Sequence, residues 1–181
     1  CLESMYRVFP GDVFALVAQQ ETVVALGIDP QRVRTSFIQK LPRAIKSYRS
    51  YLPLFPLAVE QYDVSSYDLV ISSSHAAAKG VLVNADQLHI CYCYTPMRYA
   101  WDLYHQYLKS SGLDRGLKGM VAKLILHYIR QWDLGTAQRV DHFAAISHYI
   151  ARRIKRVYNR HADVIYPPVD VLPSLSRLKD K

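Results

Sequence analysis

Side chains that could bind a substrate gather directly after strand-like stretches of this sequence. The densest group is in HICYCYTPMRYAWD, residues 89–102, where a strand-like run ends near a proline and is followed by arginine, tyrosine, tryptophan and aspartate. A serine-histidine turn at 72–75 and the serine that ends 141–147 occupy equivalent positions. Hydroxyl, guanidinium and carboxylate groups beside aromatic rings are suited to hydrogen bonding a sugar or a phosphate. The predicted substrate-binding residues are His75, Tyr94, Arg98, Tyr99, Asp102 and Ser147.

Each of these side chains also has a purely structural interpretation, which the sequence leaves open. The three serines before His75 could cap a short helix that starts near Ala76. Arg98 and Asp102 are four residues apart and, on a helix, could form a surface ion pair. An aromatic residue such as Trp101 at the start of a helix commonly packs in the core. Only the arrangement in space separates the two interpretations.

The two cysteines of the same segment, Cys91 and Cys93, raise the question of a metal site. Zinc sites use four ligands, usually as two closely spaced pairs, and the remaining cysteine, Cys1, is far upstream. Residues two apart on a strand share one face, so both thiols are expected on one side of the strand, with Tyr92 and Tyr94 on the other. We therefore predict two buried free cysteines and no metal.

No sequence pattern identifies a catalytic residue. The chain lacks GxSxG, the dinucleotide-binding GxGxxG, the phosphate-binding loop, and any carboxylate pair with the spacing of a glycosidase. The catalytic residue stays unassigned, and the residue types alone predict a basic domain with a polar pocket.

Strand-like and helical stretches alternate along the chain. The predicted strands are 12–18, 33–38, 67–74, 88–95, 141–147 and 164–166. The predicted helices are 2–9, 45–62 with breaks at Pro53 and Pro56, 99–109, 117–139 and 148–158. Strands that are apolar almost throughout are typical of a parallel sheet buried on both faces. The alternation predicts a doubly wound α/β domain, in which ligands bind beyond the carboxyl ends of the strands.

Two of the predicted helices have distinct faces. In 117–132, apolar residues recur every three or four positions, which predicts a stripe packed on the sheet. Basic residues fill the rest of that helix, so contact with a bilayer surface is the alternative. In the last helix, Ser147 is the predicted N-cap; Ile150, Ile154 and Val157 are expected to face inward and the basic side chains outward.

The composition is that of a folded basic domain. Half of the 181 residues are apolar, enough for one well-formed core. The net charge of +8 favours anionic partners such as phosphates, nucleic acid or an acidic bilayer, although basic residues also occur on ordinary solvated helix faces. Three cysteines favour a reducing compartment. No stretch reaches the roughly 20 apolar residues of a membrane-spanning helix.

Four segments together resemble a known family. They are YDLVISSSHAAAKGV, QLHICYCYTPMRYAWDLYHQYL, GLDRGLKGMVAKLILHYIRQWD and DHFAAISHYIARRIKRVY followed by VIYPPVD. Together they are similar to the N-terminal domain of family 4 glycosyltransferases, in particular mannosyltransferase-like members that assemble O-antigen and exopolysaccharide. The likeness extends from about Cys1 to Val171, and TPMRYAWD is its most specific block.

The resemblance implies a GT-B architecture, in which two Rossmann-like domains enclose the active site and transfer retains the anomeric configuration without a metal or other cofactor. Residues 1–166 would be the acceptor domain, and 167–181 the hinge and the start of the donor domain. The donor would be a nucleotide sugar such as GDP-mannose. The acceptor would be a lipid-linked saccharide, which implies a cytoplasmic protein at the inner face of the plasma membrane with no nucleic-acid partner.

By position in this family, five residues would line the cleft between the two domains: His75, Tyr94, Arg98, Tyr99 and Asp102. This chain alone would be inactive. Two positions depart from the family pattern: relatives often have His at Tyr94 and Asn at Ile146. Tyrosine keeps a hydroxyl but does not take up a proton near neutral pH, so no proton-transfer role is assigned to Tyr94.

The start of the chain also differs from the family pattern. Similar proteins begin with a strand and a glycine-rich turn, whereas this sequence opens within what resembles the following helix. In a 3-2-1-4-5 strand order, that first strand is central. Its absence is predicted to leave unpaired backbone groups on two neighbouring strands and to make the fold marginally stable.

Two other functions compete with the transferase. A non-enzymatic basic α/β module would bind nucleic acid or another polyanion through its charge, although no helix-turn-helix or RNA-reading motif is present. A sugar-nucleotide epimerase would use a similar sheet but needs a dinucleotide-binding turn, which this sequence lacks.

Overall fold

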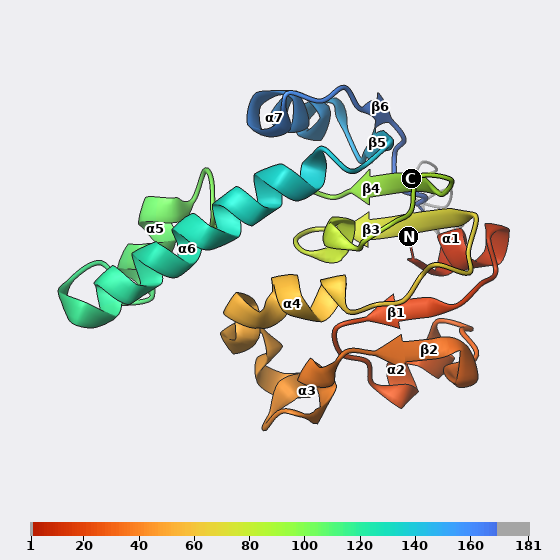
Figure 1. Cartoon of the computed structure of the whole chain (residues 1–181), viewed down its shortest axis with the longest axis horizontal. Coiled ribbons are helices and arrows are strands. Elements are labelled where there is room, and N and C mark those ends of the chain that lie inside the picture. The colour runs from red at the N-terminus through yellow and green to blue at the C-terminus, as the bar shows by residue number, and fades with distance from the viewer. Residues whose placement is uncertain (1, 170–181) are drawn as a thin grey trace, which may run out of the picture.

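A computed structural model describes residues 2–169 and shows helices packed around two parallel sheets (Figure 1). The helices are α1 (Leu2–Val8), α2 (Gln20–Ala25), α3 (Ala44–Ser47), α4 (Phe55–Glu60), α5 (Tyr104–Ser110), α6 (Gly116–Ala137) and α7 (His148–Tyr158). The strands are β1 (Val13–Ala15), β2 (Val33–Thr35), β3 (Leu69–Ser74), β4 (Leu88–Cys93), β5 (His142–Ala145) and β6 (Asp163–Val164). Short 3-10 helices are η1 (Pro30–Arg32), η2 (Phe37–Lys40), η3 (Tyr48–Leu54) and η4 (Ala78–Gly80). The prediction of an α/β chain with parallel strands is confirmed.

The larger sheet has the order β3-β4-β5-β6, and every neighbouring pair in it is parallel. Its register places Ile71 opposite Ile90 and Cys91 opposite Phe143. Parallel neighbours need crossover connections, which here contain η4, then α5 with α6, then α7. The carboxyl ends of β3, β4 and β5 consequently lie side by side at the same end of the sheet.

The smaller sheet pairs β1 with β2 and does not join the larger one. In Figure 1, the strands lie in the spatial sequence β2, β1, β3, β4, with their arrows pointing the same way. One edge of β1 and one edge of β3 therefore have no partner strand among residues 2–169. A hydrogen bond from the Tyr67 hydroxyl to the Asp12 carboxylate links the two sheets.

Helix bounds agree with the predicted ones where the sequence holds clear end signals. The range predicted for α7 is the one observed, and that predicted for α1 is one residue too long. The predicted helix 45–62 is divided into α3, η3 and α4, with Pro53 inside η3 and Pro56 in the first turn of α4. Proline lacks a backbone donor, which fits the start of a new helix at Phe55, just before Pro56. The end of α3 at Ser47 is too far before Pro53 to have the same cause. Helix α2 was not predicted.

The predicted helix 99–109 is wrong at its start, because the helix begins only at Tyr104. The preceding turn has mixed hydrogen bonds, including the Leu103 amide to the Arg98 carbonyl. The Ala100 carbonyl, which would accept from the Tyr104 amide in a continuous helix, instead accepts from Nε of Arg130 at 2.8 Å. The Arg130 side chain, from a distant part of the sequence, thus occupies a carbonyl that the first turn of the predicted helix would need.

The predicted packing of the apolar stripe on α6 is also wrong for the first half of that helix. This half extends beyond both sheets, beside α5, and has no sheet face to cover (Figure 1). The exposed side chains are Leu117, Met120, Val121, Leu124 and Tyr128. The buried face belongs largely to the second half and consists of Leu126, Ile129, Asp133, Thr136 and Ala137.

The buried residues form two clusters. One contains Ile38, Val59, Met97 and Ile129 among others. The second contains Cys91, Cys93, Phe143, Ile150 and Ile154. Both cysteines are buried and free and share one face, as predicted.

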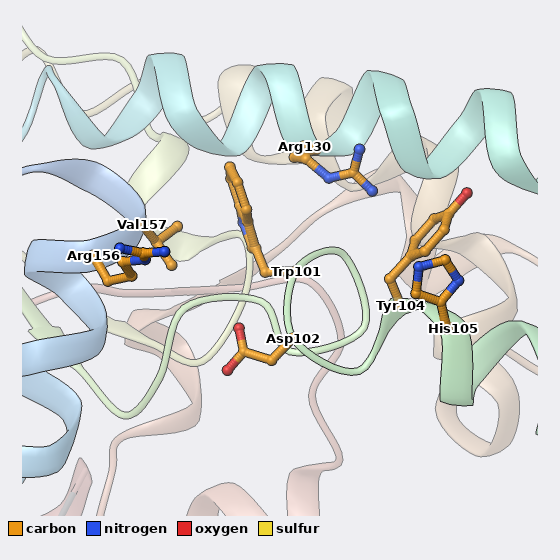
Figure 2. A pocket seen from close by; sticks show the side chains of 7 residues that line it. All are labelled: Trp101, Asp102, Tyr104, His105, Arg130, Arg156 and Val157. Atoms are coloured by element: carbon orange, nitrogen blue, oxygen red, sulfur yellow. The ribbon is translucent and has the colours of Figure 1, made fainter.

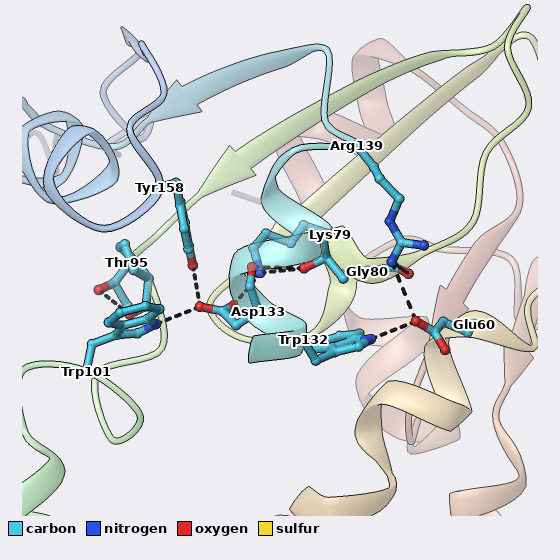
Figure 3. Close-up of polar contacts among 11 residues, drawn as sticks. Glu60, Lys79, Gly80, Thr95, Trp101, Trp132, Asp133, Arg139 and Tyr158 are labelled. Carbon is cyan, nitrogen blue, oxygen red and sulfur yellow. Dashed lines mark hydrogen bonds and ion pairs between the residues drawn. The ribbon is translucent and has the colours of Figure 1, made fainter. Parts of the chain in front are cut away.

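Gly80 lies against the indole of Trp132 in the first cluster. A Cβ atom at position 80 would come within 2.2 Å of the ring atom Cζ2. The indole cannot easily move away, because its Nε1 donates to Glu60 at 2.7 Å (Figure 3).

Candidate functional site at the strand ends

Three of the predicted site residues follow neighbouring strands at the same edge of the larger sheet. His75 comes directly after β3, Tyr94 after β4, and Ser147 after Ala145 at the end of β5. The Ser147 hydroxyl accepts a hydrogen bond from the Ile150 amide at 3.3 Å. This confirms Ser147 as the N-cap of α7 and gives its side chain a structural role.

Tyr94 belongs to a small hydroxyl pair. Its phenol oxygen accepts from the Ser73 hydroxyl at 3.2 Å, and its ring meets that of Tyr92 edge-on at 5.5 Å. The Tyr94 amide donates to the Ser74 carbonyl at 2.8 Å, which continues the β3–β4 pairing beyond the strand. The half-buried phenol is therefore fixed at the carboxyl end of β4. Its oxygen can accept a further hydrogen bond, for example from a sugar hydroxyl.

Asp102 contacts α7, so the surface ion pair with Arg98 that the sequence left open as an alternative does not form. Its carboxylate lies 2.6 Å from Nη2 of Arg153, and Nη1 of the same guanidinium donates to the Thr95 hydroxyl at 2.5 Å. Arg153 thereby connects the loop after β4 with α7. Arg98 itself is exposed.

Arg153 is a site residue that the sequence did not identify. The pattern of α7 predicted outward basic side chains, yet Arg153 is only 9% exposed. Its Nε and Nη2 atoms are buried without an aligned hydrogen bond within the described part of the chain, so the Asp102 contact is an ion contact and not an aligned hydrogen bond. Buried guanidinium groups are rare unless they are paired. The one sequence signal for the burial of Arg153 was its position three residues after Ile150, on the apolar face of the helix.

The buried carboxylate of Asp133, on α6, contacts three segments that lie next to the candidate site (Figure 3). It forms an ion pair with Lys79 of η4, in which both side chains are almost completely buried. It also accepts from Nε1 of Trp101 at 2.8 Å and from the Tyr158 hydroxyl at 2.9 Å. One side chain therefore fixes the loops after β3 and β4 and the end of α7.

The environment of Asp133 alters a neighbouring group in turn. Burial, followed by the nearby carboxylate, raises the pKa of the Tyr158 hydroxyl well above its ordinary value. Tyr158 is consequently a hydrogen-bond donor at any physiological pH. Sequence reasoning missed this cluster, because Lys79 and Asp133 are remote in sequence. The one local signal was the position of Asp133 four residues after Ile129, on the buried face of α6.

Asp102 and Trp101 line a hollow of about 560 Å³ between α6, α7 and the loop after β4 (Figure 2). Its other lining residues are Tyr104, His105, Arg130, Arg156 and Val157. The Arg130 guanidinium lies over the rings of Trp101 and Tyr104, at 5.8 and 4.9 Å from their centroids. Two arginines, a carboxylate and two aromatic rings around one hollow could bind a phosphate or a sugar.

His75 and Tyr99 do not line this hollow. His75 lines the groove between β1 and β3. Partial burial, followed by repulsion from Arg49, lowers the pKa of His75. Tyr99 packs against Tyr107 at 5.9 Å between centroids, and burial raises the pKa of its hydroxyl. His75 lines the groove and Asp102 lines the hollow, so the structure does not bring these two predicted residues to one cavity. The other four predicted residues line neither of these two cavities: Tyr94, Arg98, Tyr99 and Ser147.

Within residues 2–169, no three histidine, cysteine or acidic side chains are grouped as metal ligands. The longest helix, α6, lacks the length of continuous apolar sequence that crossing a bilayer requires, and so do the shorter helices of the described range. Comparison with protein-family models, curated proteins and solved structures finds no match to this chain.

Proposed function

We propose that this chain is the acceptor-binding half of a retaining GT-B glycosyltransferase. It would help to move a hexose, mannose in the first instance, from a nucleotide sugar such as GDP-mannose to a lipid-linked saccharide during cell-surface polysaccharide synthesis. The donor would be bound mainly by a second domain, and the hinge to that domain would lie in 167–181, most of which is outside the described residues.

One observation supports the proposal: polar side chains follow the carboxyl ends of neighbouring parallel strands, where ligands of such sheets bind. The hydroxyls of Ser73 and Tyr94 form one part, and Asp102 with its hollow forms the other. Hydroxyls and carboxylates can hydrogen-bond saccharide hydroxyls, and the guanidinium groups of Arg98 and Arg130 can bind an acceptor diphosphate. The family resemblance of TPMRYAWD supports the same reading.

The apolar face of α6 supports a peripheral membrane position. Leu117 is 72% exposed and Leu124 is 64% exposed on a part of the helix that extends away from both sheets. Arg115 and Lys118 are exposed beside them and can meet anionic lipid headgroups. An acceptor attached to a lipid would be reached from such a surface.

Acceptor binding tests the proposal directly. The chain is titrated with a short-chain polyprenyl diphosphate saccharide, and binding is followed by isothermal calorimetry. Arg98→Ala should weaken binding at least about tenfold, because a charge-assisted contact to phosphate contributes about 1.5–3 kcal/mol. Gln106→Ala, an exposed position on α5, is the control and should bind like the parent chain.

Transfer is the second measurement. Once the chain is joined to a donor-binding domain, GDP-mannose and the same acceptor should yield a mannosylated product, and Arg98→Ala should abolish it. Equal transfer by the variant would remove Arg98 from the mechanism. Absence of both binding and transfer would refute the function.

The polyanion alternative has one structural observation in its favour. Arg152, Lys155 and Arg156 are exposed together on α7. A nucleic-acid module would bind generic duplex DNA with an affinity that falls steeply as salt rises. Binding to the saccharide acceptor that exceeds binding to DNA at 150 mM salt would decide against this alternative.

A further inference from the structure

Two exposed aromatic side chains contact each other at the end of the larger sheet, where α7 begins and the chain leaves β6. His148, the first residue of α7, and Tyr166 have ring centroids 6.2 Å apart and an interplanar angle of 76°. Both side chains are exposed, and Tyr166 keeps 64% of its surface open to solvent. Neither residue belongs to a buried cluster, and neither lines the hollow at Asp102 or the groove at His75. Core packing therefore does not account for this pair.

The backbone that carries the Tyr166 ring is fixed, although the ring itself is exposed. The Ile165 amide donates to the Ala145 carbonyl at 2.9 Å, and the Ile165 carbonyl accepts from the Tyr92 hydroxyl at 3.0 Å. Pro167 follows Tyr166 and favours an extended backbone at the residue before it. An exposed ring on a fixed backbone loses little conformational entropy when a ligand binds to it.

A series of contacts connects these rings with the hydroxyl pair formed by Ser73 and Tyr94. Tyr94 lies one residue beyond β4 and Tyr166 lies two residues beyond β6, so both are at the carboxyl end of the same parallel sheet. Tyr92 contacts both positions, because its ring meets that of Tyr94 edge-on at 5.5 Å and its hydroxyl donates to Ile165, the residue before Tyr166. A ligand held at Tyr94 could therefore extend along the sheet end to the exposed rings.

The chemistry of the exposed pair suits a sugar ring. A pyranose carries hydroxyls at its rim and C–H groups on its faces, and the negative face of an aromatic ring attracts such C–H groups. The Tyr166 phenol can also exchange a hydrogen bond with a sugar hydroxyl. Tyr149, the next residue of α7, is 60% exposed but less suited, because the Arg152 guanidinium lies over its ring, 6.0 Å from the centroid.

We infer that Tyr166 and His148 form a second sugar subsite, on which the acceptor saccharide stacks beyond the hydroxyls of Ser73 and Tyr94. The inference rests on the proposed function and extends it, because it requires an acceptor with at least two sugar units. Tyr166 contacts the second sugar ring, and His148 holds the Tyr166 ring in place through their edge-on contact. The acceptor class is therefore a lipid-linked disaccharide or longer saccharide.

The test compares two acceptors that differ only in the length of the saccharide. Both have the same short polyprenyl diphosphate; one carries a single mannose and the other a mannose disaccharide. Isothermal calorimetry should show that the parent chain binds the disaccharide form at least about fivefold more tightly, as expected for one added aromatic contact. Tyr166→Ala should abolish this preference without changing the affinity for the monosaccharide form. Tyr166→Phe, which keeps the ring, and the matched control Tyr149→Ala should both retain it.

Equal affinity of the parent chain for the two acceptors would overturn the inference and leave the proposed function intact. A preference that persists in Tyr166→Ala would also count against the subsite. GDP is titrated separately: binding that Tyr166→Ala weakens, combined with equal affinity for the two acceptors, would assign the rings to a nucleobase and reject the sugar subsite. Failure of the parent chain to bind either acceptor would refute the proposed function and, with it, this inference.

Discussion

Asp133 and Lys79 form a buried ion pair in which the carboxylate also accepts hydrogen bonds from Trp101 and Tyr158. The ammonium also donates to the hydroxyl of Thr136. The pair joins α6 to the short η4 helix and supports both loops that carry the candidate site. Its contribution depends on both charges being present, because each compensates the desolvation of the other.

A double-mutant cycle should therefore show strong coupling between these two residues. Lys79→Met should lower the free energy of unfolding by about 3–5 kcal/mol, since it leaves an uncompensated buried carboxylate. Asp133→Asn should also destabilise, and the double variant should be less destabilised than the sum by about 1–3 kcal/mol. Urea unfolding measures all three. The exposed pair Arg7 and Glu3 is the control cycle, with an expected coupling of about 0.5 kcal/mol or less.

Acidification should destabilise the protein through His89. Its ring is buried, its Nε2 is 3.0 Å from the Ser72 hydroxyl, and burial lowers its pKa from 6.5 to about 4. Between these values the unfolded chain binds a proton that the folded protein does not. Stability from this group is complete above about pH 6.5 and is lost as the pH falls toward 4, by about 3 kcal/mol in total.

His89→Gln should reduce the slope of unfolding free energy against pH in that window, measured by urea titrations at several pH values. The slope is the readout, because the substitution also changes packing. His142→Gln, at an exposed position at the start of β5, should leave the slope closer to that of the parent. A parent and a His89→Gln protein with the same slope would contradict the assignment.

The exposed stripe of α6 should govern binding to lipid. Replacing Leu117 and Leu124 with Asp should reduce partitioning onto vesicles of phosphatidylcholine and phosphatidylglycerol by at least about tenfold, because each leucine transferred from water contributes about 1.5–3 kcal/mol. Vesicle sedimentation measures the effect. The control replaces Val24 and Leu57, which are exposed on α2 and α4, with Asp. A similar reduction in the control would attribute binding to general hydrophobicity and not to this stripe.

Arg153 should control the order of the turn between β4 and α5. Arg153→Met removes the contacts to Asp102 and Thr95, so the backbone amides of that turn should exchange faster by at least about tenfold. Global stability should change by less than about 2 kcal/mol, because the variant also removes a buried charge with unpaired nitrogens. Arg152→Met changes the exposed neighbour and should leave exchange in the turn unaltered.

The sequence predicted the elements whose causes are local. Helix α7 begins after its serine cap, which the sequence identified, and it ends before Asn159, which adopts a left-handed conformation. The parallel sheet followed from continuous apolar runs. The positions of His75, Tyr94 and Ser147 after their strands followed from the same reasoning.

The features that the sequence did not predict depend on distant contacts. The helix expected from Tyr99 is displaced because Arg130, on another helix, occupies the Ala100 carbonyl. The stripe on α6 has helical spacing whether or not a sheet lies beneath it, so spacing could not predict its exposure. The burial of Arg153 depends on Thr95 and Asp102, which approach it only after the chain folds.

The contact between Gly80 and Trp132 limits which residues position 80 can accept. The neighbouring indole leaves no room for a Cβ atom at this position. Even alanine, the smallest alternative, would push the ring away from the hydrogen bond that it donates to Glu60. A randomised library at this codon, selected for folded protein, should return glycine almost alone. A smaller residue at position 132 should allow larger residues at position 80. The residues accepted at the two positions should therefore depend on each other.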